Sequence, residues 1–267
     1  MTLPTIFVSH GAPNLILRNS AARDFLLAYG DELTRAHGRP KAILMATAHF
    51  EAAEPTLTAD EKPGTIYDFG GFEPELYQMT YDAPGSPALA RRAAELLAAA
   101  GHAPRLATNR GFDHGTWVPL KLLFPKADIP VVQLSVQPQR DGAWHAALGR
   151  ALSPLREEGV LIMGSGTATH NLREIFRLLR AGDANAPAPE WVSAFNDWLH
   201  EKAEAGAIDD IAHYLERAPY GRENHPTPDH FLPLPFAMGA AGAGAKGQRV
   251  HASQQFGAMM MDAYAFH

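Results

Sequence analysis

The sequence predicts an α/β fold in which a central, mostly parallel sheet is flanked by helices. Three observations favour this fold. Short uncharged runs of strand length alternate with longer segments whose apolar residues recur at helical spacing. The short runs are apolar throughout, as expected of strands buried on both faces. Several of them end in histidine, serine or glycine, which places polar groups where ligands bind to open α/β sheets, beyond the carboxyl ends of the strands.

The first two strands each deliver a histidine to that edge. The first strand is predicted at residues 5–8 and continues through Ser9 and His10 into a Gly/Pro turn. The second, residues 42–49, ends at His49. Because both side chains stand at the carboxyl ends of strands, we expect His10 and His49 to share one site, a metal site.

Helices and a long loop fill the chain between these strands and residue 101. Asn19 or Ser20 is predicted to cap a helix that runs to about His37, because a glycine and a proline follow as stop signals. From residue 56 to 86 the periodicity is lost, which indicates a long loop. Its aromatic and glycine cluster at residues 65–72 is interpreted either as a wall of a pocket or as a plug that ties the loop to the core. Ser86 followed by proline then starts a helix that ends near Gly101.

The middle of the chain repeats the strand and helix pattern. Residues 105–108 are predicted as a short strand, and residues 111–117 as a turn that holds His114 between two glycines. Residues 129–136 read as a buried strand. The helix that follows, residues 144–155, should break near its Pro154.

The next buried strand, residues 160–163, leads through Gly164-Ser165-Gly166 to His170. His170 is expected at the start of a helix with one apolar face, where the positive end of the helix dipole disfavours the imidazolium. A neutral imidazole there can act as a base or as a metal ligand.

The last third of the chain contains two more amphipathic helices, near residues 191–199 and 208–215. Between His225 and His230 two prolines are expected to hold the segment extended and to aim His230 rigidly into a site. The remaining segments are predicted as a short helix up to residue 241, a glycine-rich loop at 242–247, and two closing strands at 249–255 and 259–266.

Composition sets limits on the function. The 267 residues are 46% hydrophobic and 19% charged, typical of a globular protein, and we expect one domain over residues 1–267. A net charge of −6 without runs of like charge argues against nucleic acid or an anionic membrane as partner. There is no cysteine, so a metal must be held by histidine and carboxylate. The N-terminus lacks the pattern of a signal peptide, and we expect a cytoplasmic protein.

Twelve of the 13 histidines fall into two groups. Six lie in helix ends, on polar faces or at the terminus, and we expect them at the surface: His37, His102, His145, His200, His213 and His267. Six others are fixed by strand ends, glycine turns or prolines: His10, His49, His114, His170, His225 and His230. Any one of these alone could be a histidine satisfied by backbone hydrogen bonds, but their joint placement on one edge of the sheet favours a shared site.

Histidine ligands narrow the choice of metal. Imidazole suits iron and zinc, whereas magnesium and calcium prefer oxygen. Non-haem iron oxygenases use two histidines and a carboxylate with open positions, and a third histidine can replace the carboxylate. The carboxylates that could compete for this place, or support a ligand, are Asp229, Asp113 and Glu51.

Six segments, in this order along nearly the whole chain, resemble the class III extradiol ring-cleaving dioxygenases of the DOPA-dioxygenase type. They are Ser9-His10-Gly11-Ala12-Pro13, Ala48-His49-Phe50, residues 67–72, Gly111-Phe112-Asp113-His114-Gly115, residues 164–173 and residues 225–233.

The resemblance implies a metal held by His10, His49 and His230. It places His170 at the open positions, as acid/base or as a fourth ligand, and His114 in the pocket as a substrate contact or proton donor. It further implies iron(II) for ring cleavage, with zinc(II) as another metal found in such proteins. The partners it implies are dioxygen and a small aromatic substrate, a catechol. His225, Tyr67 and Phe69 are candidate substrate contacts.

Two other functions are weighed beside ring cleavage. A zinc hydrolase could use the same histidines, although neither a His-Glu-x-x-His motif nor a Gly-x-Ser-x-Gly elbow is present. A metal- or ligand-binding relative without catalysis would have no chemical need for His170 and His114. An amino-acid catechol would need a partner for its carboxylate, for which Arg173, Arg222 and Arg249 are the candidates. The sequence leaves the oligomeric state open.

Overall fold

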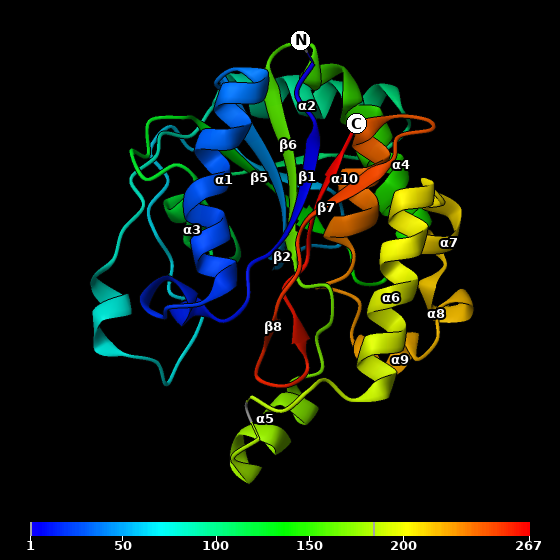
Figure 1. Ribbon diagram of the computed structural model, residues 1–267. Helices are drawn as coiled ribbons and strands as arrows, with labels where there is room; N and C mark the ends of the chain where they lie inside the picture. The colour runs from blue at the N-terminus through cyan, green and yellow to red at the C-terminus, as the bar shows by residue number, and fades with distance from the viewer. Residues whose placement is uncertain (1, 184) are drawn as a thin grey trace.

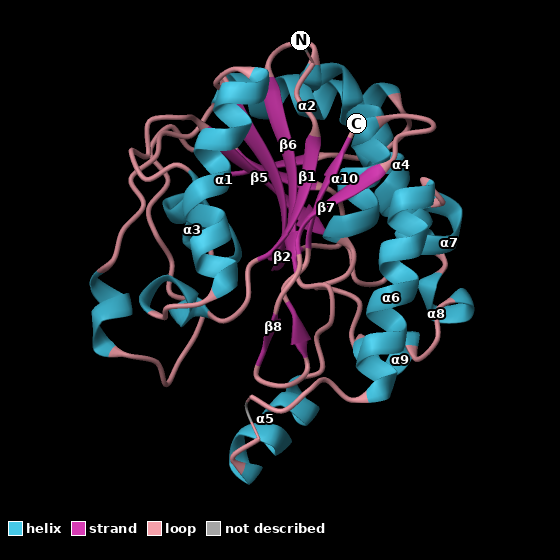
Figure 2. Cartoon of the chain, viewed as in Figure 1, coloured by secondary structure: helices cyan, strands magenta, loops and turns pink. Residues whose placement is uncertain are grey.

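The computed structural model describes residues 2–183 and 185–267, and it confirms the predicted α/β architecture. Eight strands form one sheet in the order β4-β3-β5-β2-β6-β1-β10-β7. The central strands β5, β2, β6 and β1 are parallel, while β10 and β7 close one edge in antiparallel fashion. Helices lie on both faces of the sheet, as Figures 1 and 2 show.

The strands of this sheet have the following bounds: β1 Thr5–Ser9, β2 Ala42–Glu51, β3 Thr56–Thr58, β4 Arg105–Ala107, β5 Val131–Val136, β6 Val160–Gly166, β7 Gly247–His251 and β10 Ala263–Phe266. A separate hairpin pairs β8 Gln254–Gln255 with β9 Met259–Met260. The two predicted closing strands are therefore each interrupted. Only the beginning of the first predicted strand, in β7, and the end of the second, in β10, join the eight-stranded sheet.

The helices are α1 Ala21–His37, α2 Pro87–Ala99, α3 His114–Leu123, α4 Gly142–Leu152, α5 Leu172–Ala181, α6 Glu190–Ala205, α7 Ile208–Ala212, α8 Tyr214–Arg217, α9 Gly221–Asn224 and α10 Pro233–Ala241. Three 3₁₀ helices occupy Pro13–Leu17, Pro74–Gln78 and Ser153–Arg156. Ser20 and Ser86 cap α1 and α2 with their hydroxyl oxygens, as their positions predict. The break expected at Pro154 is the change from α4 to a 3₁₀ turn.

Alternate residues of the central strands face two different cores. In β2, Ile43 and Met45 pack in the core under α1 and α3, whereas Leu44 and Ala46 pack in the core under α2, α4 and α10. This two-sided burial explains why the strands read as continuous apolar runs. Figure 1 shows α1 and α3 on one side of the sheet and α4 and α10 on the other.

Helix α10 is buried on all sides and lies unusually close to its neighbours. A Cβ at Gly149 of α4 would lie 2.0 Å from the carbonyl oxygen of Phe236, and one at Gly164 of β6 would lie 2.1 Å from that of Pro233. Both positions therefore require glycine. This close packing fixes the start of α10, and with it the loop that carries His230.

Three predictions about the local structure are wrong. His114 does not sit in a turn: it is the first residue of α3, because the Asp113 side chain accepts a hydrogen bond from the backbone of Thr116 and caps the helix. The segment between His225 and His230 is a series of bends and turns rather than extended chain. His145, expected at the surface, is 1% exposed.

The buried His145 is satisfied by the backbone on both sides. Its Nδ1 lies 2.8 Å from the carbonyl oxygen of Asp141, and its Nε2 accepts from the backbone N–H of Gln137 at 3.1 Å. These bonds require the neutral ring. Burial lowers the pKa of His145 to about 4.

This burial predicts a pH dependence of folding. The unfolded chain binds a proton at this histidine below pH about 6.5 and the folded chain does not, so the contribution to stability is complete above that pH and is lost as the pH falls toward 4. Between about pH 7.5 and about pH 5 the loss amounts to about 2 kcal/mol. Urea titrations at the two pH values should show a smaller pH dependence of the free energy of unfolding for His145→Gln. The control variant His213→Gln, at a half-exposed histidine, should keep the pH dependence of the wild type. The same pH dependence in all three proteins would contradict the role assigned to His145.

Candidate metal centre

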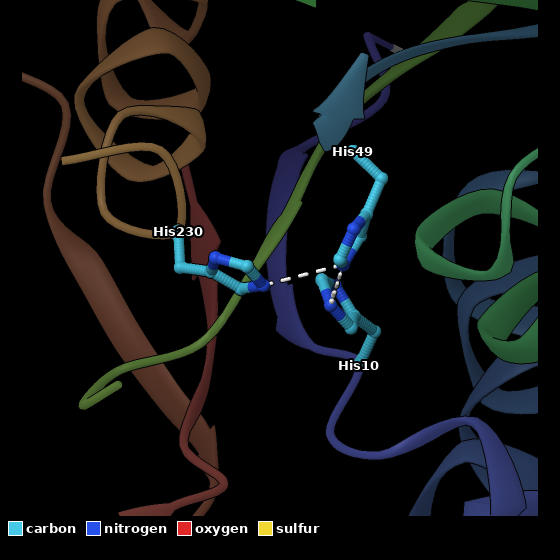
Figure 3. A group of neighbouring side chains, drawn as sticks. All are labelled: His10, His49 and His230. Atoms are coloured by element: carbon cyan, nitrogen blue, oxygen red, sulfur yellow. Dashed lines mark hydrogen bonds between the residues drawn. The ribbon is translucent and has the colours of Figure 1, made fainter. Parts of the chain in front are cut away.

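Three histidines from distant parts of the chain converge at the carboxyl edge of the sheet. His10 directly follows β1, His49 lies near the C-terminal end of β2, and His230 lies in the turn before α10. The Nε2 atom of His49 lies 3.0 Å from Nε2 of His10 and 3.2 Å from Nε2 of His230. Figure 3 shows the three rings pointing toward one another from three different segments.

The outer nitrogens of these rings have polar partners. Ser165 donates its hydroxyl hydrogen to the carbonyl oxygen of Gly115, so its oxygen is free to accept from Nδ1 of His10 at 3.0 Å. Nδ1 of His230 lies 2.5 Å from a carboxylate oxygen of Asp229, and Nδ1 of His49 lies 3.5 Å from one of Asp68. With hydrogens on the outer nitrogens, three Nε2 lone pairs face one another.

Such an arrangement fits a bound metal ion. Three facing lone pairs repel one another unless a cation lies between them. Two nitrogens that each lie about 2.1 Å from one metal are about 3.0 to 3.4 Å apart when the angle between them is between a right angle and a tetrahedral one. The observed separations of 3.0 and 3.2 Å fall within this interval. His10, His49 and His230 are therefore residues that could hold a metal.

Glycines on β6 and α3 let these rings approach. A Cβ at Gly166 would lie 2.1 Å from the carbonyl oxygen of His230, and one at Gly115 would lie 2.9 Å from Cδ2 of His49. The backbone also ties the segments together, since Thr167 donates to the His230 carbonyl and His10 donates to that of Gly166. The positions of the three histidines are thus fixed by the sheet itself.

A second acidic group supports the other side of the site. The Asp68 carboxylate accepts from the backbone N–H of His114 and lies 2.9 Å from its Nδ1. Although burial raises the pKa of Asp68, its hydrogen bonds to His114 outweigh that effect and leave the pKa below its usual value. Asp68 was not singled out in the sequence, because a lone aspartate in an aperiodic loop carries no spacing signal; its place between aromatics and glycines was the available hint.

His170 closes the site from the side of α5, which begins two residues later. Its ring stacks on that of His230 with 3.5 Å between centroids. Burial and, after it, the neighbouring His230 lower the pKa of His170 to about 2. Burial likewise lowers the pKa values of His10 and His49 well below the usual range. Neutral rings are the form that binds metal or accepts a proton.

The candidate carboxylates differ in position. Asp229 contacts His230, and this hydrogen bond, which outweighs burial, leaves the pKa of Asp229 below its usual value. Asp113 is fully buried behind the site, where it accepts from Thr47 and pairs with Arg110 at 3.2 Å. Glu51 is exposed. Of the three, Asp229 is the one that touches a histidine of the centre.

A cavity of about 660 Å³ opens beside the histidines. Its inner end is formed by His49, His114, His170 and His230, and its walls are mostly apolar. Phe69 lies in the wall, in agreement with one of the two interpretations of that loop. The outer wall is α5, whose Phe176 is 53% exposed although it is apolar. Such a cavity has the size and lining of a small-molecule site.

Two predicted substrate contacts do not line this cavity. Tyr67 donates its hydroxyl to the carbonyl oxygen of Met79 and packs edge-on against Phe69, so it ties the loop to the core. Within the aromatic cluster, Phe69 therefore forms part of the pocket wall, whereas Tyr67 acts as the plug. His225 is 2% exposed, lies among core aromatics, and its Nε2 is 2.9 Å from the Ala168 carbonyl. Its position is that of a core histidine.

The predicted arginines are also elsewhere. Arg249 pairs with Asp262, and neither Arg173 nor Arg222 lines the cavity. The arginine that does is Arg18, next to the 3₁₀ helix that follows His10. It was missed because a single arginine in a turn looks like an ordinary surface residue.

Together, a mostly parallel α/β sheet, convergent imidazoles at its carboxyl edge and an aromatic-walled cavity define the class of a histidine-centred enzyme that acts on small molecules. The family follows from comparison: residues 4–266 match the family described as the catalytic LigB subunit of aromatic ring-opening dioxygenase. The chain belongs to this family. It is therefore a member of the aromatic ring-opening dioxygenases, as the resemblance of its motifs implied.

Named relatives and a solved structure agree over nearly the full length. The chain is 43% identical to a 4,5-DOPA dioxygenase extradiol of Beta vulgaris, over 98% of this chain and 96% of that protein. It is 39% identical to a protein of the same name from Escherichia coli K12, over 89% and 85%. The crystal structure of an uncharacterized protein from Escherichia coli K12 superposes with a TM-score of 0.79 at 33% identity, over 99% of this chain and all of that one.

No helix within residues 2–183 and 185–267 combines the length and the apolar character needed to cross a membrane.

The support of His230 by Asp229 predicts a change in metal affinity. Asp229→Asn removes the carboxylate that orients the His230 ring toward the metal, so the affinity for zinc(II) should fall by about 10- to 100-fold. Competition with a chromophoric chelator measures this. Asp209, which lies 3.3 Å from His213 at the surface, offers a matched control, and Asp209→Asn should bind zinc as the wild type does. Equal affinity in both variants would contradict the role of Asp229.

Proposed function

We propose that this protein is an extradiol dioxygenase that inserts both atoms of dioxygen into a DOPA-like catechol and yields a muconic semialdehyde. The observation that carries the proposal is the trio of Nε2 atoms that face one another beside an aromatic-walled cavity. The relatives named 4,5-DOPA dioxygenase extradiol support the reaction and the substrate class. Both oxygen atoms enter the product, so the reaction needs no external reductant.

In this proposal His10, His49 and His230 hold iron(II). Iron(II) held there would supply the redox chemistry that ring cleavage by dioxygen requires. Zinc(II) suits the same three nitrogens but has no redox chemistry, so zinc-loaded protein should bind metal without cleaving rings. The hydrolase alternative gains no support from the family or from the relatives.

The histidines around the trio have separate roles. His170, neutral and stacked on His230, accepts a proton from a catechol hydroxyl as the substrate enters. His170 returns this proton during ring opening, and His114, which lines the cavity with its Nδ1 held by Asp68, contacts the bound substrate. Phe69 packs edge-on against His114 and covers it from water.

The reaction itself can be tested directly. Metal-free protein should be reconstituted with iron(II) without oxygen and then exposed to air with DOPA, protocatechuate or simple catechols. We expect a yellow product and uptake of one dioxygen per substrate, and zinc-loaded protein serves as the control. Stoichiometric iron binding without oxygen uptake on any catechol would contradict the proposed reaction.

A second prediction concerns His170. His170→Ala should retain stoichiometric iron but lower kcat/KM for the catechol by at least about 100-fold, since a positioned acid/base contributes factors of this size. Metal content and oxygen uptake are measured on the same preparation, beside His213→Ala as a surface control. A variant with full activity would remove His170 from the mechanism, and one without iron would make it a ligand.

A further inference from the structure

The wall of the cavity carries two charged side chains in an otherwise apolar surface. Apart from the histidines, Arg18 and Glu73 are the charged residues among the described residues that line it. They come from different segments: Arg18 follows the 3₁₀ helix after His10, and Glu73 ends the aromatic loop. Their side chains lie 3.1 Å apart and are 56% and 41% exposed.

A third polar residue joins them with an unused acceptor. Asn14, 5% exposed, donates its amide to both oxygens of Glu73, at 3.2 and 3.1 Å. Its own carbonyl oxygen, Oδ1, is buried and accepts no hydrogen bond from the residues that the structure describes. Asn14 therefore holds the Glu73 carboxylate in place in the cavity wall.

The charges of this group determine what it can recognise. A substituent with a single charge would be attracted to one side chain of the pair and repelled by the other, whereas a zwitterion presents a partner to each. An ion pair at this exposure contributes little by itself, so little is lost when a ligand separates its members. The carboxylate of an α-amino acid matches Arg18, and its ammonium group matches Glu73.

We propose that Arg18, Glu73 and Asn14 form a head-group site that selects catechols bearing a zwitterionic α-amino acid. The inference rests on the proposed ring cleavage and assigns the specificity of that reaction to residues outside the histidine cluster. The catechol ring would occupy the inner end beside His49 and His170, and the side chain would extend along Phe69 and Phe72 to the head-group site.

Four catechols separate the charges in the experiment. DOPA carries both groups, dopamine lacks the carboxylate, dihydrocaffeate lacks the ammonium, and 4-methylcatechol lacks both. For the iron(II)-loaded wild type we expect kcat/KM to be highest for DOPA, by about tenfold over each of the others, mainly through KM. Arg18→Met should reduce the preference for DOPA over dopamine, and Glu73→Gln that for DOPA over dihydrocaffeate.

The chain offers a matched control for these variants. Arg92 and Glu158 form an ion pair of similar exposure, 44% and 42%, at 2.9 Å and away from the cavity. Arg92→Met should leave all four ratios as in the wild type. If Arg18→Met and Glu73→Gln give the ratios of this control, or if the wild type does not distinguish the four catechols, the head-group site is wrong while ring cleavage stands.

A binding measurement keeps the two proposals separable. Calorimetric titration of the same four catechols into the zinc-loaded protein reports recognition without turnover. Tighter binding of DOPA that is lost in Arg18→Met supports the head-group site even if no catechol consumes oxygen, a result that would overturn only the proposed reaction. Equal binding of all four would overturn the head-group site.

Discussion

The convergence of three imidazole Nε2 atoms is the constraint on which the rest of this structure depends. Facing lone pairs at 3.0 and 3.2 Å repel one another, so the rings must be held in place by other bonds. Their outer nitrogens meet a hydroxyl and two carboxylates. The backbone of Gly166, at the end of β6, anchors His10, and that of the next residue, Thr167, anchors the carbonyl of His230. The glycines of β6 serve the same end, since any side chain there would push the His230 loop away.

The cavity combines two kinds of surface around this centre. Burial keeps the rings of His10, His49 and His170 neutral, which is the state that can bind a metal or take up a proton. The aromatic loop and α5 supply apolar walls that exclude water from the reacting end. The charged side chains of Arg18 and Glu73 line the far side of the cavity. The chemistry and the recognition of the substrate are therefore assigned to opposite ends of one cavity.

The errors of sequence interpretation share a physical cause. His145 was expected on a polar face, and His225 was assigned to the site because of its prolines and the family resemblance. Each is instead buried with a ring nitrogen bonded to a backbone group, and such bonds leave no mark on the sequence. His114 was expected in a turn because of its flanking glycines, but Asp113 before it caps the segment, which therefore forms a helix. Asp68 and Arg18 were overlooked because a single charged residue in an aperiodic segment has no spacing to mark it.

Local patterns were sufficient for the fold class and for the strand-end histidines His10 and His49. Strand-length apolar runs and capped helices reflect burial on two faces and backbone hydrogen bonding, which act over a few residues, and a histidine at a strand end marks the edge of the sheet. The meeting of His230 with His10 and His49, the burial of His145 and the lining of the cavity were decided by tertiary structure alone. They depend on contacts between segments up to 220 residues apart in sequence (His10 to His230), whose distances no local pattern contains.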